Sequence, residues 1–188
     1  MSQNSLLPNV PNMISFVRLL SVPLTVWLLL NEFYVAAFWI FVAAGISDAV
    51  DGYIAKRFHL QSELGRYLDP LADKALLVSV FVTLGHVDLM ETWLVILVVF
   101  RDALIICGAL LGHLLQQKLA MRPTMISKIN TSAQLLLAAT VMLMAGDGIS
   151  NAQATVILTY LVAASTFVSG AVYVVSWGQQ AVELEPGE

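Results

Sequence analysis

The strongest constraint on this chain is a series of long apolar segments that recurs from one end to the other. A helix that crosses a bilayer needs about twenty mostly apolar residues, because lipid offers no hydrogen-bond partners to open backbone groups. The sequence therefore predicts an all-α membrane protein with six transmembrane helices, folded as a single integral membrane domain over residues 1–188. The segments that meet the requirement are approximately 13–31, 34–56, 69–87, 92–115, 127–145 and 153–177.

Composition points the same way, since 59% of the residues are hydrophobic, only 12% are charged and the mean hydropathy is +0.81. A soluble domain has about a quarter of its residues charged. The net charge is −4 and there is no basic run, so nucleic acid is not an expected partner. The first twelve residues contain no Lys or Arg and resemble neither a secretory signal nor a transit peptide, so we expect the chain to be mature from its first residue.

The basic residues indicate an orientation in the membrane. All nine Lys and Arg fall toward one side of the predicted helices, whereas the opposite loops, near 31–33, 86–92 and 145–152, hold acidic residues and no basic one. By the positive-inside rule, the 56–68 and 116–127 loops and both termini are expected in the cytoplasm. We expect the membrane to be a bacterial plasma membrane, because the chain is short and shows no transit peptide.

Four aspartates lie close together between two of the apolar segments. Asp48 and Asp51 are three residues apart, and Asp69 and Asp73 are four apart, so each pair lies on one face of its helix. A short loop joins the two predicted helices, which lets the pairs converge. Four converging carboxylates would repel one another, and two divalent cations would neutralise them. Oxygen ligands suit hard ions, so we expect two Mg²⁺ or Mn²⁺ ions.

A second interpretation makes these aspartates helix caps or salt-bridge partners of neighbouring basic residues. Small residues beside the acidic pairs instead favour a binding pocket, because they let a flat ligand approach the backbone. Gly52 and Ala55 follow the first pair, and Gly65 precedes the second. The basic residues available to the second interpretation are Lys56, Arg57, Arg66 and Lys74.

Taken together, these residues resemble the signature of the CDP-alcohol phosphotransferases, D-x-x-D-G-x-x-A-(K/R)-x8-G-x3-D-x3-D. Lys56 departs from the usual pattern, because the family normally has Arg there and Lys lacks the bidentate fork of Arg. The resemblance is carried by Asp48, Asp51, Gly52, Ala55, Lys56, Gly65, Asp69 and Asp73.

The resemblance implies a six-helix membrane enzyme, usually a homodimer, that cleaves CDP-diacylglycerol or a related CDP-alcohol. Such an enzyme transfers the phosphatidyl group to an acceptor hydroxyl and releases CMP. By motif position, the four aspartates hold two metal ions, and Asp73 also acts as general base on the acceptor hydroxyl. Gly52, Ala55 and Gly65 make room for the cytidine, and Lys56 contacts the diphosphate.

Two further segments bear on the acceptor. Arg101 and Asp102, within an apolar run, must face the protein interior or a hydrated cavity. Arg101 either binds an anion in the acceptor site or only pairs with other charges. The stretch "MRPTMISKINTSAQ" resembles the P-T-x-I-S-K-x-N-T-x-x-Q segment of cardiolipin synthases of the CDP-alcohol type. Arg122, Lys128 and Asn130 therefore join Arg101 as candidate acceptor-binding residues, unless Lys128 and Asn130 only anchor a helix end at the interface.

Phosphatidylglycerophosphate synthases read nearer G-K-x-K-T in this segment, with a second Lys where this chain has Asn130. Glycerol 3-phosphate carries nearly two charges and favours several cations, whereas phosphatidylglycerol carries one charge and two acyl chains. The sequence thus favours CDP-diacylglycerol and phosphatidylglycerol as substrates, giving cardiolipin and CMP. Alternatives are glycerol 3-phosphate as acceptor, a small cation or proton transporter, and a membrane scaffold that binds CDP-diacylglycerol without turnover.

Two smaller motifs have open interpretations. Near the start of the first apolar segment, Asn12, Ser15 and Arg18 either reach the substrate phosphates or serve as helix caps and an interfacial cation. In the fourth segment, Gly108 and Gly112 form a G-x-x-x-G pattern that supports either helix packing or dimerisation.

Overall fold

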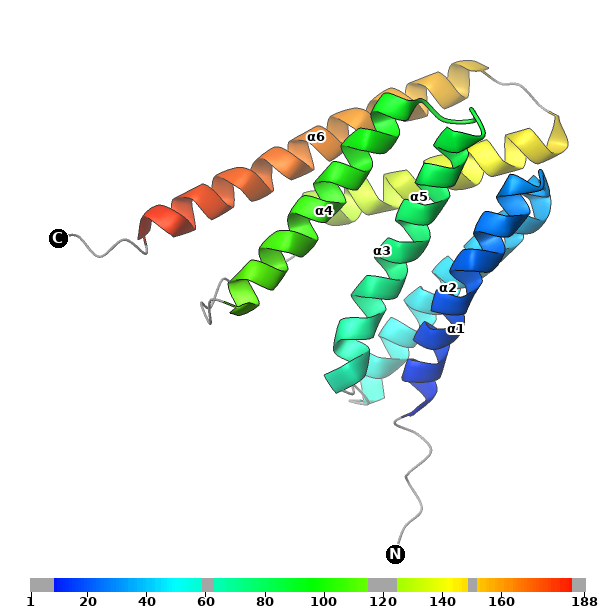
Figure 1. Ribbon diagram of the computed structural model, residues 1–188. Helices are drawn as coiled ribbons and strands as arrows, with labels where there is room; N and C mark the ends of the chain where they lie inside the picture. The colour runs from blue at the N-terminus through cyan, green and yellow to red at the C-terminus, as the bar shows by residue number, and fades with distance from the viewer. Residues whose placement is uncertain (1–8, 59–62, 115–124, 149–151, 184–188) are drawn as a thin grey trace, which may run out of the picture. The chain divides into compact units, whose positions relative to one another are not determined.

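The computed structural model describes the backbone of residues 9–58, 63–114, 125–148 and 152–183, and the side chains of 16–47, 72–108, 125–148 and 153–177. The described residues form six α-helices, which confirms the predicted helical fold (Figure 1). The helices are α1 (Asn9–Leu30), α2 (Tyr34–Phe58), α3 (Glu63–His86), α4 (Thr92–Leu114), α5 (Met125–Asp147) and α6 (Ala152–Glu183).

Two of these helices are long and apolar enough to cross a membrane within the residues that the structure describes. They are α5 and the Gln153–Trp177 part of α6, and shorter apolar stretches occupy Phe16–Leu30 and Tyr34–Ser47. Large apolar side chains such as Phe100 and Phe167 are mostly exposed, as is typical of surfaces that face lipid. These features support membrane association, and six membrane crossings stay a prediction.

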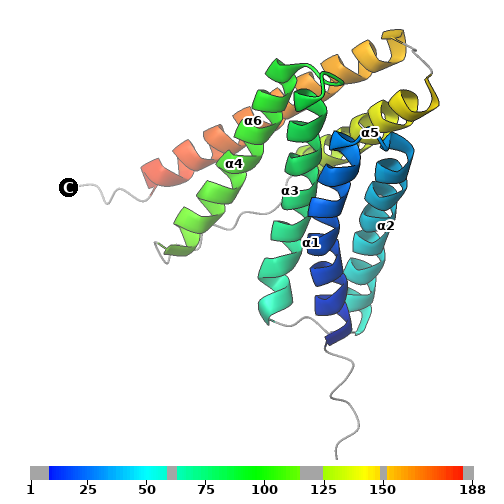
Figure 2. The same cartoon turned by 45° about the vertical axis from the view of Figure 1, so that its right-hand side comes forward.

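The chain divides into two compact units, and the prediction of one integral domain over 1–188 stays a prediction. Unit 1 contains Met1–Met90 and Ala138–Ser150, and unit 2 contains Glu91–Leu137 and Asn151–Glu188. In unit 1, α1 packs along both α2 and α3 (Figure 2). The beginning of α1, the end of α2 and the beginning of α3 lie at the same end of this unit (Figures 1 and 2).

One face of α3 supplies much of the core of unit 1. Leu76, Leu77, Val80, Phe81 and Leu84 are all nearly or completely buried. Their spacing of three and four residues places them on a single stripe of the helix. Burying such a side chain contributes about 1.5–3 kcal/mol relative to leaving it in water, and the stripe fixes which face of α3 turns inward.

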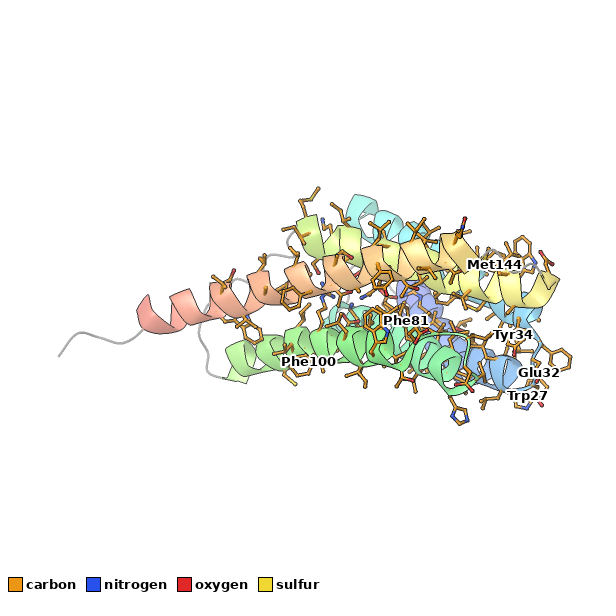
Figure 3. All side chains as sticks on the ribbon, turned by 90° about the horizontal axis from the view of Figure 1, so that it is seen from above. Trp27, Glu32, Tyr34, Phe81, Phe100 and Met144 are labelled. Carbon is orange, nitrogen blue, oxygen red and sulfur yellow. The ribbon has the colours of Figure 1, made fainter. Side chains whose placement is uncertain are left out.

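The turn between α1 and α2 closes with a Schellman motif, in which two amides bond back across the helix end. The Glu32 amide donates to Leu29 O at 3.1 Å and the Phe33 amide donates to Leu28 O at 2.9 Å. Glu32 takes the left-handed position with φ of 63°, where glycine is usual. Asp88, with φ of 56°, holds the equivalent position after α3. Figure 3 shows Glu32 at the tip of the α1–α2 hairpin, near Trp27 and Tyr34.

In unit 2, α4 packs against α6. Gly108 on α4 lies directly under the indole of Trp177 on α6, because a Cβ built at Gly108 would overlap the Cη2 atom of that ring. Only a residue without a side chain fits there, so Gly108 serves helix packing within the chain. The second glycine of the G-x-x-x-G pattern, Gly112, lies outside the residues whose side chains are described.

Candidate active site

The acidic motif lies on α2 and α3 at matching levels. Asp48 and Asp51 lie ten and seven residues before the last residue of α2, and Asp69 and Asp73 lie six and ten residues after the first residue of α3. With a rise of about 1.5 Å per residue, Asp51 and Asp69 are ~10 Å from the helix ends, and Asp48 and Asp73 are ~15 Å from them. Because those helix ends lie at the same end of unit 1, the two pairs lie at similar levels along α2 and α3, and their convergence stays a prediction (Figure 1).

Most of the predicted site residues fall on helical backbone whose side chains are not described. Asp48, Asp51, Gly52, Ala55 and Lys56 belong to α2, and Gly65 and Asp69 belong to α3. Arg122 lies outside the described residues altogether. The roles assigned to these residues as metal ligands, cytidine-contacting residues and phosphate-contacting residues therefore stay predictions.

Asp73 is described in full, and it forms an ion pair with α1. The Arg18 Nη1 atom donates to Asp73 Oδ1 at 2.7 Å. The Arg18 side chain is 2% exposed and the Asp73 side chain is 38% exposed, so the carboxylate keeps an open face while its cation is covered. Arg18 is therefore covered by the protein, and its guanidinium holds Asp73 in place from a third helix.

The residue types of the motif fit hard divalent cations. Carboxylate oxygens are the protein ligands that Mg²⁺ and similar hard ions take. Among the residues whose side chains the structure describes, no group of three His, Cys, Asp or Glu side chains gathers in a metal-binding arrangement. Three of the four motif aspartates are not among those residues, so the fit rests on ligand chemistry and backbone level.

In unit 2, Arg101 on α4 is buried and bound by groups of its own chain. Its Nη1 donates to Asp102 Oδ1 at 2.6 Å, and its Nη2 donates to Ser127 Oγ at 2.5 Å. Ser169 Oγ accepts from both Nη2 at 2.7 Å and Nε at 3.2 Å, and the guanidinium carbon lies 6.0 Å from the Tyr173 ring centroid. Arg101 thus ties together α4, the start of α5, and α6, with most of its donors already engaged.

A second polar group lies one turn further along α5. Asn130 Oδ1 accepts hydrogen bonds from Ser165 Oγ at 2.7 Å and from Thr166 Oγ1 at 2.9 Å. Gln134 Nε2 donates to the same Thr166 hydroxyl at 3.3 Å. Asn130, Gln134 and Thr166 are fully buried, whereas Lys128 on the same helix is exposed. The structure therefore separates Lys128 from Asn130, which the sequence had grouped together.

Sequence reasoning missed the contribution of α6 to these polar groups. Ser165, Thr166 and Ser169 lie on α6 at spacings of one, three and four residues, and each binds a side chain from α4 or α5. The available signal was their spacing, because three hydroxyl residues on one face of an apolar helix indicate a polar partner.

These observations define a class of protein: helical, membrane-associated and with paired carboxylates on two consecutive helices that both pack on α1. The model of the CDP-alcohol phosphatidyltransferase family matches residues 8–175, so the chain belongs to that family. The family consists of membrane-associated transferases that use divalent metal ions. Membership of this family favours the transferase interpretation of the sequence over the transporter and scaffold alternatives.

Several named proteins are similar to this chain. The chloroplastic CDP-diacylglycerol–glycerol-3-phosphate 3-phosphatidyltransferase 1 of Oryza sativa subsp. japonica is 35% identical over 91% of this chain and 57% of its own length. The cardiolipin synthase (CMP-forming) of Homo sapiens is 34% identical over 69% of this chain and 48% of its own. The cardiolipin synthase (CMP-forming) of Streptomyces coelicolor is 35% identical over 55% and 52% respectively. The chain spans about half the length of the curated relatives that it matches.

Proposed function

We propose that this protein is a CMP-forming cardiolipin synthase. It transfers the phosphatidyl group of CDP-diacylglycerol to the free hydroxyl of phosphatidylglycerol and releases CMP. Relatives in both animals and bacteria that bear this name support the proposal. The observation that carries the choice of acceptor is the environment of Asn130, which is fully buried and bound by two hydroxyl groups. Both partners of Asn130 Oδ1 among the described residues are hydroxyls, and neither is an acidic group that would pair with the second Lys of the phosphatidylglycerophosphate synthase pattern.

The chemistry of the proposed reaction places Asp73 at the acceptor. The acceptor oxygen forms a bond to the phosphorus of the phosphatidyl group while the bond from that phosphorus to the CMP oxygen breaks. Asp73 takes the proton of the attacking hydroxyl, and its partly open carboxylate is the side chain suited to that contact. The ion pair with Arg18 keeps the carboxylate oriented, so little reorganisation is needed when the alcohol arrives.

The donor site follows from the motif. We propose that Asp48, Asp51, Asp69 and Asp73 hold two divalent ions, Mg²⁺ or Mn²⁺. When bound, such ions supply charge stabilisation for a diphosphate and make CMP a better leaving group. Gly52, Ala55 and Gly65 leave space for the cytidine beside α2 and α3, and Lys56 provides a positive charge for the diphosphate. CDP-diacylglycerol already partitions into the membrane, which agrees with the apolar surface of the protein.

The acceptor residues are proposed with different weights of support. Lys128 is exposed, and its cation suits the single charge of a phosphodiester. Arg122 is proposed for the same charge from the sequence alone. Arg101 is better suited to holding α4, α5 and α6 together than to binding an anion directly, because Asp102, Ser127 and Ser169 engage its donors. We further propose six transmembrane helices, cytoplasmic termini, a bacterial plasma membrane and a homodimer.

The test is a two-acceptor assay on the purified full chain in detergent micelles. CDP-diacylglycerol is offered with either phosphatidylglycerol or glycerol 3-phosphate, and CMP and lipid products are measured with Mg²⁺ or Mn²⁺. We expect cardiolipin from phosphatidylglycerol, loss of activity on adding a chelator, and a loss of at least 10³-fold in kcat for Asp73→Asn, in keeping with removal of a general base and metal ligand. Asp88→Asn, on an exposed turn after the same helix, is the matched control and should keep full activity.

A second function is favoured by a specific comparison. The rice relative, named as a phosphatidyltransferase for glycerol 3-phosphate, matches 91% of this chain. Product from glycerol 3-phosphate alone would assign that function and overturn the choice of phosphatidylglycerol. Transfer to neither acceptor, with CDP-diacylglycerol still bound, would overturn both.

A further inference from the structure

The ion pair between Arg18 and Asp73 places a buried cation against one of the proposed metal ligands. Arg18 Nη1 donates to Asp73 Oδ1 at 2.7 Å, across the packed surfaces of α1 and α3. The Arg18 side chain is 2% exposed, whereas the Asp73 side chain is 38% exposed. Both helices belong to unit 1 and run side by side (Figures 1 and 2), so the contact lies within one compact unit.

The core of unit 1 fixes the place of each residue on its helix. On α3, Asp73 lies three and four residues before Leu76 and Leu77, which begin the buried stripe. Its carboxylate therefore lies where that stripe ends and becomes partly exposed. On α1, Arg18 lies about two turns before Thr25, which is fully buried. Arg18 therefore cannot carry its charge into water without leaving the packed face of α1.

A buried cation at this distance has two opposing effects on the carboxylate. A charge-assisted hydrogen bond fixes the direction of Asp73, which favours a group that must meet a hydroxyl in one geometry. The same positive charge repels any divalent ion that the carboxylate binds, and the repulsion is weakly screened because the guanidinium is covered by protein. The ion pair thus improves the orientation of Asp73 and opposes its use as a metal ligand.

We propose that Arg18 is a positioning residue that orients Asp73 for proton transfer and lowers the affinity of the acidic motif for a divalent ion. The proposal rests on the proposed function and deepens it, because it adds to the site a residue from outside the motif. The proton still passes from the acceptor hydroxyl to Asp73, and Arg18 exchanges none. Turnover and metal affinity should therefore respond to the loss of Arg18 in opposite directions, whereas a residue that only holds α1 against α3 would weaken both when lost.

The first measurement is the dissociation constant of Mn²⁺ on the full chain in non-ionic detergent micelles without lipid substrates, with free Mn²⁺ followed by electron paramagnetic resonance. Arg18→Met removes the charge, and Arg18→Gln removes the charge but keeps an N–H donor. Arg18→Lys keeps the charge but lacks the planar fork of donors. We expect both neutral variants to bind Mn²⁺ at least fivefold more tightly than the wild type, and Arg18→Lys to stay within about twofold of it.

The second measurement is kcat at saturating Mn²⁺, so that a change in metal occupancy cannot account for the result. With CDP-diacylglycerol and phosphatidylglycerol, Arg18→Met should lower kcat at least tenfold, because the carboxylate loses its fixed direction. Asn31→Asp is the matched control, since it lowers the net charge by the same single unit on the exposed turn after α1. That turn is about 20 Å along the helix from Arg18, beyond the screening length in physiological salt, so both values should stay at wild type.

Each outcome decides the proposal. Tighter Mn²⁺ binding in the folded neutral variants with a lower kcat supports it, and Arg18→Gln decides if Arg18→Met does not fold. Unchanged or weaker Mn²⁺ binding in those variants overturns it, as does a wild-type kcat in Arg18→Met. If the wild type binds no Mn²⁺, the proposed metal site fails together with this inference. If glycerol 3-phosphate alone reacts, only the choice of acceptor fails, because the Mn²⁺ titration and kcat with that acceptor still decide the role of Arg18.

Discussion

The contact between Gly108 and Trp177 predicts that Gly108→Ala changes the stability of the protein in the direction opposite to the one that helix propensity predicts. Alanine is more favourable than glycine in a helix interior by about 0.8–1.0 kcal/mol, so propensity alone predicts that Gly108→Ala stabilises the protein. The structure predicts the opposite, because the new Cβ would overlap the Cη2 and Cζ2 atoms of the Trp177 ring. The indole must leave its place on α4 for the alanine to fit.

The magnitude follows from the two opposing effects. Forcing extra volume into a packed contact costs about 1–3 kcal/mol, and the gain in propensity offsets up to about 1 kcal/mol of it. Gly108→Ala should therefore lower the free energy of unfolding by about 0–2 kcal/mol. In a Trp177→Ala background, the same change should raise the free energy of unfolding by about 1 kcal/mol. The coupling energy between the two positions is then about 1–3 kcal/mol.

The measurement is a double-mutant cycle in detergent micelles. The wild type, the two single variants and the double variant are unfolded by denaturant, and helix content is followed by circular dichroism. A Gly108→Ala protein that gains about 1 kcal/mol in the presence of Trp177 would refute the packing argument. A coupling energy near zero would refute it as well.

Two further predictions concern the turns and the buried ion pair. Glu32→Gly should raise the free energy of unfolding by about 0.5–1 kcal/mol, because glycine adopts the left-handed φ of 63° without steric cost. Glu91→Gly, at a position without positive φ, is the control and should not raise it. Thermal unfolding in micelles measures both variants. Asp102→Asn should cost about 3–5 kcal/mol, because it leaves the buried Arg101 cation uncompensated, and Arg101→Met combined with Asp102→Asn should cost less than Asp102→Asn alone. A double variant that is less stable than Asp102→Asn would contradict the second prediction.

The sequence predicted the helices well and their ends less well. The apolar pattern identified all six, because a run of about twenty apolar residues leaves the backbone few other options. The beginning of α3 was predicted at 69, but the helix starts at Glu63, because its first turns carry charged residues that lower the local hydropathy. The end of α6 was predicted at 177 and lies at Glu183, because the polar residues after Trp177 end the apolar run but not the helix.

The candidate site was also predicted only in part from the sequence. The acidic motif was visible in the sequence because its spacing is set within one helix at a time, and the matching levels on α2 and α3 agree with it. The partner of Asp73 was not visible, because Arg18 is 55 residues away in the chain and only the packing of α1 on α3 brings it to 2.7 Å. The spacing of residues within one helix can be read from the sequence, whereas tertiary packing decides which of several basic residues pairs with Asp73.

For the polar groups of unit 2, too, the sequence could not identify the tertiary partners. Arg101 had two interpretations, an anion-binding residue or a partner of other charges, and hydropathy cannot separate them. The structure shows the partners, because Ser127 and Ser169 come from two other helices. Asn130 was grouped with Lys128 as part of one segment, but residues two positions apart on a helix face different sides, and their burial differs accordingly.

The ion pair between Arg101 and Asp102 joins adjacent residues, so it requires no other helix. During synthesis, α4 emerges from the ribosome before α5 and α6, which later supply Ser127 and Ser169. In the proposed six-helix topology, the insertion machinery would meet α4 as a nearly neutral segment, because its two charges already cancel and each isolated charge costs about 2.5–3.5 kcal/mol at the centre of a helix. In that topology the nascent helix would enter lipid first and acquire its hydroxyl partners afterwards.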